Sequence, residues 1–560
     1  MTKAKDNTKL KKFSDLYDCA REAYGETMER LERNLQQYRG SCEIDGGMEN
    51  ASMVRNITYE LIESEISPDI PCAKVEAEGY TEVSEELAFA AERLLYMARE
   101  RLPLEEINDS DERSTYIFGG SILFLEWQND QRGDGEIAVR QLSPMDFVPE
   151  PGIGRIEDMS YCFLKFTTNK GELLAKYGVP EEDLPKAECG YRWGGSISLD
   201  DTVNLIIAFY KSEDGTVGRF IFSGELVLAD EEDYYGSLVC EDENLSANCG
   251  DFGKNSLQNS DVLVKVGKVK KYKPCDFPIV LRKNISSEGE LLGTSDADVL
   301  RPTQQAINKI ESRIMQKLLR AAVTPIMPED ASVSLTNAIF GQVIKIKAGE
   351  SASSYGTVDT TPDISQDIEE ANRLYDQAKR LIGISDAYQG IDFNKVESGY
   401  AKSLRIKQAQ SRLESKRRMK NVAYERLYKL IFQHYLAFCG SSKQLSYKDG
   451  YGQVRYQRFD KNDFIYTTEN GTREYFDRLL FSVDTDLYAE YEREALWAKN
   501  LENLTSGTLG DKENPVTLLR YWQFQERAHY PNAKENVEYF KSIVEKERNN
   551  EDEQEKSDGN

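Results

Sequence analysis

The side chains most able to do chemistry in this chain are carboxylates, because histidine is scarce. Only two histidines occur among the 560 residues, His434 and His529, and both fall in segments with helical periodicity, far apart along the chain. A histidine-dependent triad or metal site needs several such groups close together. The sequence therefore predicts packing or capping roles for both. It also lacks a G-x-x-x-x-G-K-S/T phosphate loop, a G-x-G-x-x-G motif and a G-x-S-x-G motif.

Carboxylates are numerous enough to build a two-metal nuclease site, in which paired metal ions clamp the attacking and leaving oxygens of a phosphodiester. Close acidic pairs such as Asp109 and Asp111, or Glu369 and Glu370, are candidates. With 97 acidic residues in the chain, however, such pairs arise by abundance alone, and each is most simply part of a solvated helix face. We expect no catalytic residue, no metal and no cofactor. A carboxylate- and metal-dependent nucleic-acid enzyme stays as the alternative.

The densest run of one charge sign is basic. From Lys402 to Lys420 the chain has eight Lys or Arg residues and one acid, Glu414, although the whole chain carries a net charge of −26. Such a run can neutralise nucleic-acid phosphates or pair with acidic faces of adjacent helices or subunits. The excess of acids favours pairing. The residues predicted to pair between subunits are Lys402, Arg405, Arg412, Arg417 and Arg418 on the basic run, and Asp363, Asp367, Glu369 and Glu370 on an acidic helix before it.

This basic run lies in the longest predicted helix, which opens at Ser398 and Gly399 and reaches Phe438 without a proline or an interior glycine. About 40 residues at about 1.5 Å each make a rod roughly 60 Å long. A helix that is polar nearly all round does not fit a single-chain core. The sequence therefore predicts that the rod finds its partners in neighbouring copies of the chain.

Composition sets further bounds. An apolar content of 39% and an aromatic content of 10% are typical of folded domains. Nine scattered cysteines without a CxxC motif predict reduced thiols rather than disulfides or zinc. The apolar runs are too short to cross a bilayer, and the first residues show no apolar signal region, so we expect no membrane partner and no secretory signal. The acidic balance disfavours a surface that grips DNA.

Periodicity and turn residues predict an α+β protein. The expected helices cover residues 14–39, 50–66, 84–101, 105–118, 169–177, 295–322, 363–384, 398–438, 488–504, 515–528 and 533–546. Single strands are expected at residues 121–128, 136–142, 161–166, 261–272 and 279–282. A three-strand meander is expected within 203–229, and a β-rich stretch within 444–484. Pro302 marks either the first turn of its helix or a kink. Residues 230–260 read as a polar surface loop.

Several local strings resemble, in order, the portal proteins of tailed bacteriophages. Each string alone is weak, and their order over about residues 14 to 440 carries the resemblance. The strings are NITYELI at 56–62, GGSILFLEW at 119–127, SPMDFVP at 143–149, FPI at 277–279, GTS at 293–295 followed by a helix with Gln304, Gln305 and Asn308, and ESGYA at 397–401.

The resemblance implies a portal fold with an α/β wing, a helical stem, a small β-containing clip, a long spine helix and a helical crown, assembled as a cyclic ring of about twelve copies. It implies the following division: wing 1–294, first stem helix 295–322, clip 323–362, second stem helix 363–384, tunnel loop 385–397, long wing and crown helix 398–439, returning wing strands 440–486, crown 487–548 and a disordered acidic tail 549–560.

In that family double-stranded DNA is packaged and ejected through the axis of a ring at one capsid vertex. The resemblance implies that the terminase large subunit docks on the ring, that head-completion or adaptor proteins later replace it, and that the major capsid and scaffolding proteins surround it. It places assembly in the host cytoplasm and the finished ring in the virion. The residues implied to face the DNA are Tyr388, Gln389, Asp392, Asn394 and Lys395. Another head–tail connector is a second alternative.

Overall fold

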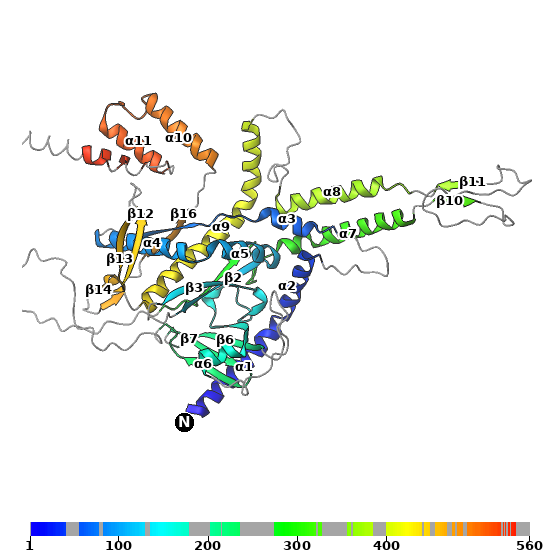
Figure 1. Cartoon of the computed structure of the whole chain (residues 1–560), viewed down its shortest axis with the longest axis horizontal. Helices are drawn as coiled ribbons and strands as arrows, with labels where there is room; N and C mark the ends of the chain where they lie inside the picture. The colour runs from blue at the N-terminus through cyan, green and yellow to red at the C-terminus, as the bar shows by residue number, and fades with distance from the viewer. Residues whose placement is uncertain are drawn as a thin grey trace, which may run out of the picture.

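The computed structural model shows an α+β protein in which helices surround antiparallel sheets (Figure 1). The residues that the structure describes are 2–40, 55–77, 82–128, 135–178, 202–213, 215–235, 274–320, 323–326, 356–359, 362–384, 399–439, 442–448, 454–467, 473–475, 479–484, 490–527, 530, 533, 536–537 and 539–544.

The chain begins with two consecutive helices, α1 (Thr2–Ala23) and α2 (Gly25–Tyr38), where the sequence predicts one. The break falls at Tyr24, whose backbone has φ −90° and ψ 0°. The adjacent glycine weakens helix propagation at this point. One face of α1 buries Leu10, Phe13, Tyr17 and Ala20 against the five-stranded sheet described next.

That sheet is an antiparallel meander in the order β4 (Phe147–Pro149), β5 (Tyr161–Asn169), β6 (Thr202–Lys211), β7 (Val217–Ser223) and β8 (Leu226–Glu231). The short helix α6 (Lys170–Tyr177) follows β5. The meander predicted within 203–229 is confirmed, and the start of the expected polar loop belongs to β8 instead. Residues 236–260 of the expected loop, and the strand expected at 261–272, lie outside the described residues.

A second sheet lies at the centre of the body, with β2 (Gly120–Gln128) between β3 (Glu136–Leu142) and β9 (Ile279–Lys283). The helices α4 (Glu82–Arg101) and α5 (Leu104–Phe118) precede it in the chain. Nearly every residue of β2 is buried, which explains its continuous apolar run.

Gly119 joins α5 to β2 and has φ 84°, the left-handed conformation that ends many helices. Its carbonyl accepts from the backbone N–H groups of Asn284 and Gly293, each at 3.0 Å. A Cβ at this position would lie 2.1 Å from the carbonyl oxygen of Gly293. Only glycine therefore fits this junction, which fixes the segment leading into α7.

Two helices, α7 (Asp296–Arg320) and α8 (Ser365–Ile382), pack side by side and project from the body, and β10 (Val323–Ile326) pairs with β11 (Gly356–Asp359) at their far end (Figure 1). Ser295 caps α7, because its hydroxyl accepts from the N–H of Asp298 at 2.9 Å. Pro302 lies inside α7, so its placement in the first turn is wrong. The base of the pair packs on α3 (Ile57–Glu65).

The longest helix, α9 (Gly399–Phe438), matches its predicted range. It contacts β9, β2 and α4, and its C-terminal half enters the main core through buried residues such as Tyr424, Leu427 and Phe432. The expectation that the whole rod depends on neighbouring copies is wrong for this half. The apolar positions there are frequent enough to give it a single-chain core.

The remaining strands form two-stranded sheets. β1 (Cys72–Ala77) pairs with β16 (Leu479–Asp484), β12 (Lys443–Lys448) with β13 (Val454–Phe459), and β14 (Ile465–Thr467) with β15 (Arg473–Tyr475). Near the C-terminus α10 (Glu490–Thr505) packs on α11 (Pro515–Arg527). The helix expected at 533–546 is helical at the residues that are described.

Candidate functional site: the base of the projecting helix pair

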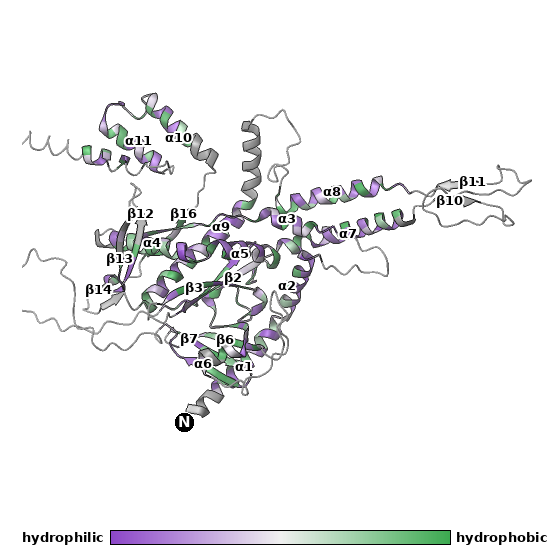
Figure 2. Cartoon of the chain, in the orientation of Figure 1, coloured by the Kyte–Doolittle hydropathy of each residue, from purple (hydrophilic) through white to green (hydrophobic). Residues whose placement is uncertain are grey.

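Ion pairs between side chains join the two projecting helices, α7 and α8. The Asp367 carboxylate of α8 forms ion pairs with Arg313 and Lys317 of α7, each at 2.5 Å. The hydrogen bond from the Lys317 ammonium lowers the pKa of Asp367 below its usual value. Asp367 is thus paired within its own chain, to cations that the sequence analysis did not single out. Along both helices hydrophilic residues alternate with hydrophobic ones (Figure 2).

A buried network of uncharged side chains fixes the base of α7. The side-chain oxygen of Gln304 accepts from the N–H and the hydroxyl of Thr58, both at 3.1 Å. Its amide nitrogen donates to the Arg55 carbonyl at 2.7 Å and to the Asn308 side chain at 2.8 Å. From α2, Gln37 donates to the Thr58 hydroxyl at 2.9 Å. Since buried polar groups require their partners, this network holds α2, α3 and α7 in one register.

A buried charge cluster lies beside this network and connects it to α9. Its seven members come from α3, α5, β9, α7 and α9, and none is more than 7% exposed. They are Glu65, Asp111, Glu112, Arg282, Asp296, Lys416 and Lys420.

One half of the cluster is balanced in charge. A single guanidinium nitrogen of Arg282 donates to Asp111 at 2.6 Å and to Glu112 at 2.8 Å, and Lys420 pairs with Glu112 at 2.8 Å. Burial raises the pKa of Glu112, but the Arg282 guanidinium and the Lys420 ammonium outweigh it and leave that pKa below its usual value. The hydroxyl of Ser121 also donates to Asp111. These contacts hold α5, β9 and α9 together.

The other half has one cation between two acids. The Lys416 ammonium lies 2.7 Å from Glu65 and 2.8 Å from Asp296, and 5.0 Å from the ring centre of Tyr116. Burial raises the pKa of Glu65 to about 8, with a further contribution from the neighbouring Asp296. For Lys416, burial lowers the pKa, and the two carboxylates more than reverse that effect. The half-cluster joins α3, the first turn of α7 and α9.

Of the five basic residues predicted to pair between subunits, the structure describes the side chains of two. Arg417 and Arg418 are exposed, and Arg418 pairs with Glu414 one turn earlier on α9, at 2.6 Å. Lys402, Arg405 and Arg412 lie on α9, but their side chains are outside the described set. Pairing of these residues between subunits therefore stays a prediction.

Apart from Asp367, the predicted acidic residues on α8 or just before it make local contacts or face solvent. Asp363 accepts from the N–H of Ser365 at 2.9 Å, and Glu370 pairs with Arg373 at 2.6 Å on the same helix. Glu369 is exposed. The five residues predicted to face DNA, all within 385–397, lie outside the described residues.

Sequence reasoning missed the buried charge cluster. The prediction that Asp109 and Asp111 belong to a solvated helix face is wrong for Asp111, because that residue is 1% exposed. Asp111 and Glu112 follow Ile107 and Asn108 by four residues, on the buried side of α5. That spacing was the available signal: two acids continue the stripe that a core-facing helix normally fills with apolar residues.

His434 has the packing role that the sequence predicts. Its Nδ1 lies 2.7 Å from the carbonyl oxygen of Leu430, and its ring packs on Tyr235 and Phe438. Burial lowers its pKa to about 4, so the ring is neutral at neutral pH. His529 is outside the described residues.

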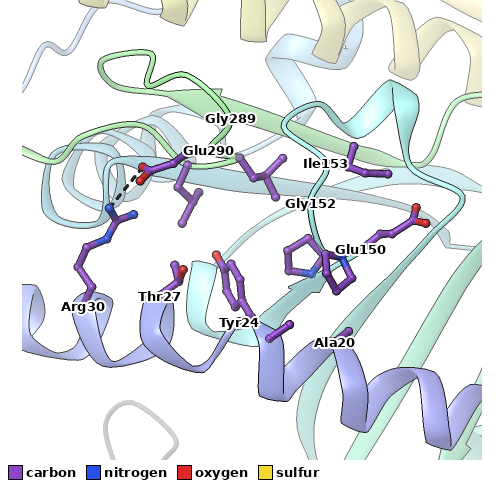
Figure 3. Close-up of a pocket in the computed structure, with 14 residues that line it drawn as sticks. Ala20, Tyr24, Thr27, Arg30, Glu150, Gly152, Ile153, Gly289 and Glu290 are labelled. Atoms are coloured by element: carbon purple, nitrogen blue, oxygen red, sulfur yellow. Dashed lines mark hydrogen bonds and ion pairs between the residues drawn. The ribbon is translucent and has the colours of Figure 1, made fainter.

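A pocket of about 200 Å³ lies between the junction of α1 and α2 and two turns of the body (Figure 3). Tyr24 and Arg30 come from the helices, and Arg30 pairs with Glu290 across the pocket at 3.4 Å. Burial raises the pKa of the Tyr24 phenol well above its usual value, so it stays protonated. The residues lining this pocket include neither histidine nor cysteine, and nothing in their arrangement pairs a nucleophile with a base.

Among the described residues, no group of three or more His, Cys, Asp or Glu side chains is placed to hold a metal ion. No helix in the described part of the chain has both the length and the apolar character needed to cross a membrane. Comparison with protein-family models and with curated proteins finds no match.

Proposed function

We propose that this chain is the portal protein of a tailed double-stranded DNA phage, a structural conduit without chemistry of its own. One observation carries the proposal. An α+β body leads into two antiparallel helices that project from it and end in a two-stranded tip, and the chain then continues as the 40-residue helix α9. This order of elements is the one that the resemblance implies for wing, stem, clip and spine.

In this proposal α7 and α8 are the stem, and β10 with β11 belongs to the clip, where the terminase and later the adaptor proteins dock. The helices α10 and α11 belong to the crown. The buried networks at the base of α7 suit a stem, because a stem that bears load during DNA movement needs a rigid attachment to the body. Satisfied buried polar networks supply rigidity and a unique register.

The charge balance is consistent with a DNA conduit. Each copy carries a net charge of −26, so a ring of about twelve copies is strongly acidic. An acidic wall repels phosphates, which lets DNA slide without sticking. A cyclic head-to-tail arrangement also gives exposed charges such as Arg417 a partner surface on the next copy without leaving an open edge.

Negative-stain electron microscopy of the purified protein tests the proposal directly. We expect annular particles with an axial hole. A compact monomer that cleaves DNA in the presence of magnesium would instead support the carboxylate-dependent enzyme. A monomer with neither property would reject the portal.

Charge reversal on α9 tests the pairing between copies. We expect the double substitution Arg417→Glu and Arg418→Glu to reduce the fraction of rings at least about tenfold, which corresponds to about 1.4 kcal/mol, because both side chains are exposed. Analytical ultracentrifugation measures this fraction. The matched control is Lys11→Glu with Lys12→Glu, the same charge change at exposed positions of α1. Equal ring fractions in the two variants would reject the pairing role.

A further inference from the structure

The buried charge cluster holds more negative than positive charge. Its seven described members are four carboxyl groups and three cations, and all of them are almost fully shielded from solvent. An unbalanced charge in such a place is costly, and a buried group normally changes its protonation to avoid it. Either a proton or an added cation must therefore compensate one carboxylate.

The geometry locates the excess in one half of the cluster. Asp111 and Glu112 face two cations, Arg282 and Lys420, and are balanced. Glu65 and Asp296 face a single ammonium, that of Lys416, which is within 2.9 Å of both. In addition, the Oε1 atom of Glu65 is buried and has no hydrogen-bond partner in the described part of the chain.

Two carboxylates that share one site cannot both ionise easily, and the usual solution is a shared proton. We propose that Glu65 and Asp296 hold one proton between them at neutral pH, and that this proton makes the junction of α3, α7 and α9 a pH-sensitive latch. With the proton present, both carboxyl groups contact Lys416 and the three helices close on it. Without it, two negative charges repel each other across one ammonium.

The other groups around this pair do not supply the missing positive charge. From α5, the Tyr116 ring packs on Lys416 and Glu112 adds a further negative charge. From the segment after β9, Asn284 donates to Asp296 at 3.1 Å and is uncharged. Arg282 and Lys420 are engaged by Glu112. Since the described residues also hold no group of three or more His, Cys, Asp or Glu side chains placed to bind a metal ion, the compensation is assigned to the proton.

The sign of the pH effect follows from the raised pKa. Burial and Asp296 raise the pKa of Glu65 from 4.5 to about 8. The closed junction thus binds a proton that the open one releases, so the stabilisation is complete below about pH 4.5 and is lost as the pH rises through about 8. Between these values the opening constant increases up to about tenfold per pH unit.

Hydrogen exchange followed by mass spectrometry, read at peptides of α3 and the first turn of α7, tests the latch between pH 5.5 and 9. After correction for intrinsic exchange, we expect the wild-type chain to open increasingly as the pH rises. Glu65→Gln keeps the shape of the protonated carboxyl group and should give protection that no longer changes with pH. If Glu65→Gln retains the wild-type pH dependence, the shared proton is rejected.

Glu112→Gln is the matched control, because it makes the same change at a carboxylate that faces two cations. We expect this variant to lose protection in α5 at every pH while the wild-type pH dependence remains at α3. Infrared difference spectroscopy gives a second measurement. A carboxylic-acid carbonyl band should disappear on titration of the wild-type chain and be missing from Glu65→Gln, and the same band in both proteins would overturn the assignment.

Discussion

Replacing Arg282 with methionine will lower the free energy of local unfolding at α5 and β2 by about 3–5 kcal/mol. The methionine fills most of the space of the arginine stem but leaves Asp111 and Glu112 buried, with only Lys420 to compensate them. Removing one partner of a buried ion pair costs this much because the remaining charge stays desolvated. Hydrogen exchange at peptides from 104–128 measures the change.

Arg418→Met is the matched control for Arg282→Met. Arg418 pairs with Glu414 on the surface of α9, where its side chain is 72% exposed. Helix pairs of this kind contribute about 0.3–0.5 kcal/mol, so we expect almost no change in protection. Similar losses in the two variants would show that the buried cluster has no special weight in stability.

Replacing Gly119 with alanine will destabilise the junction between α5, β2 and α7 by about 2–5 kcal/mol, combining the strain of a left-handed residue with overpacking. The new Cβ would meet the backbone carbonyl oxygen of Gly293, whose N–H is hydrogen-bonded to the Gly119 carbonyl. Exchange at the first turn of α7 and at the start of β2 reports the effect.

Gly289→Ala separates the two contributions to that effect. Gly289 has φ 76°, close to the value at Gly119, but a Cβ there meets no atom within 4 Å. It should therefore cost only the strain, about 1–2 kcal/mol. If both alanine variants lose the same stability, the close approach to Gly293 is not what demands glycine at Gly119.

Most elements were predictable because their signals are local. The ranges of α5, α9 and β2 agree with the predicted ranges to within about two residues, since caps, glycines and hydrophobic periodicity mark their ends. The break at Tyr24 was missed, because a single glycine beside it is compatible with a continuous helix. Of the two alternatives for Pro302, the first turn is wrong, because Pro302 lies more than a full turn inside α7, and the kink stays a prediction.

The candidate site was less predictable, because it depends on contacts between distant segments. The basic run on α9 was visible, but its members look alike in sequence. Lys416 and Lys420 turn inward to acids of α3, α5 and α7, whereas Arg417 and Arg418 face solvent. Which face of a polar helix is buried depends on where the rest of the chain packs, and a helix without an apolar stripe does not reveal it.

The pairing of β1 with β16 bears on how the protein is made. The hydroxyl of Ser482 donates to the carbonyl of Lys74, 408 residues earlier in the chain. At about 5–20 residues per second, a ribosome needs roughly 20–80 s to synthesise the second strand after the first. The first strand therefore emerges long before its partner exists. We expect this part of the body to finish folding only after β16 has left the ribosome, with the edge of β1 unpaired in the interval.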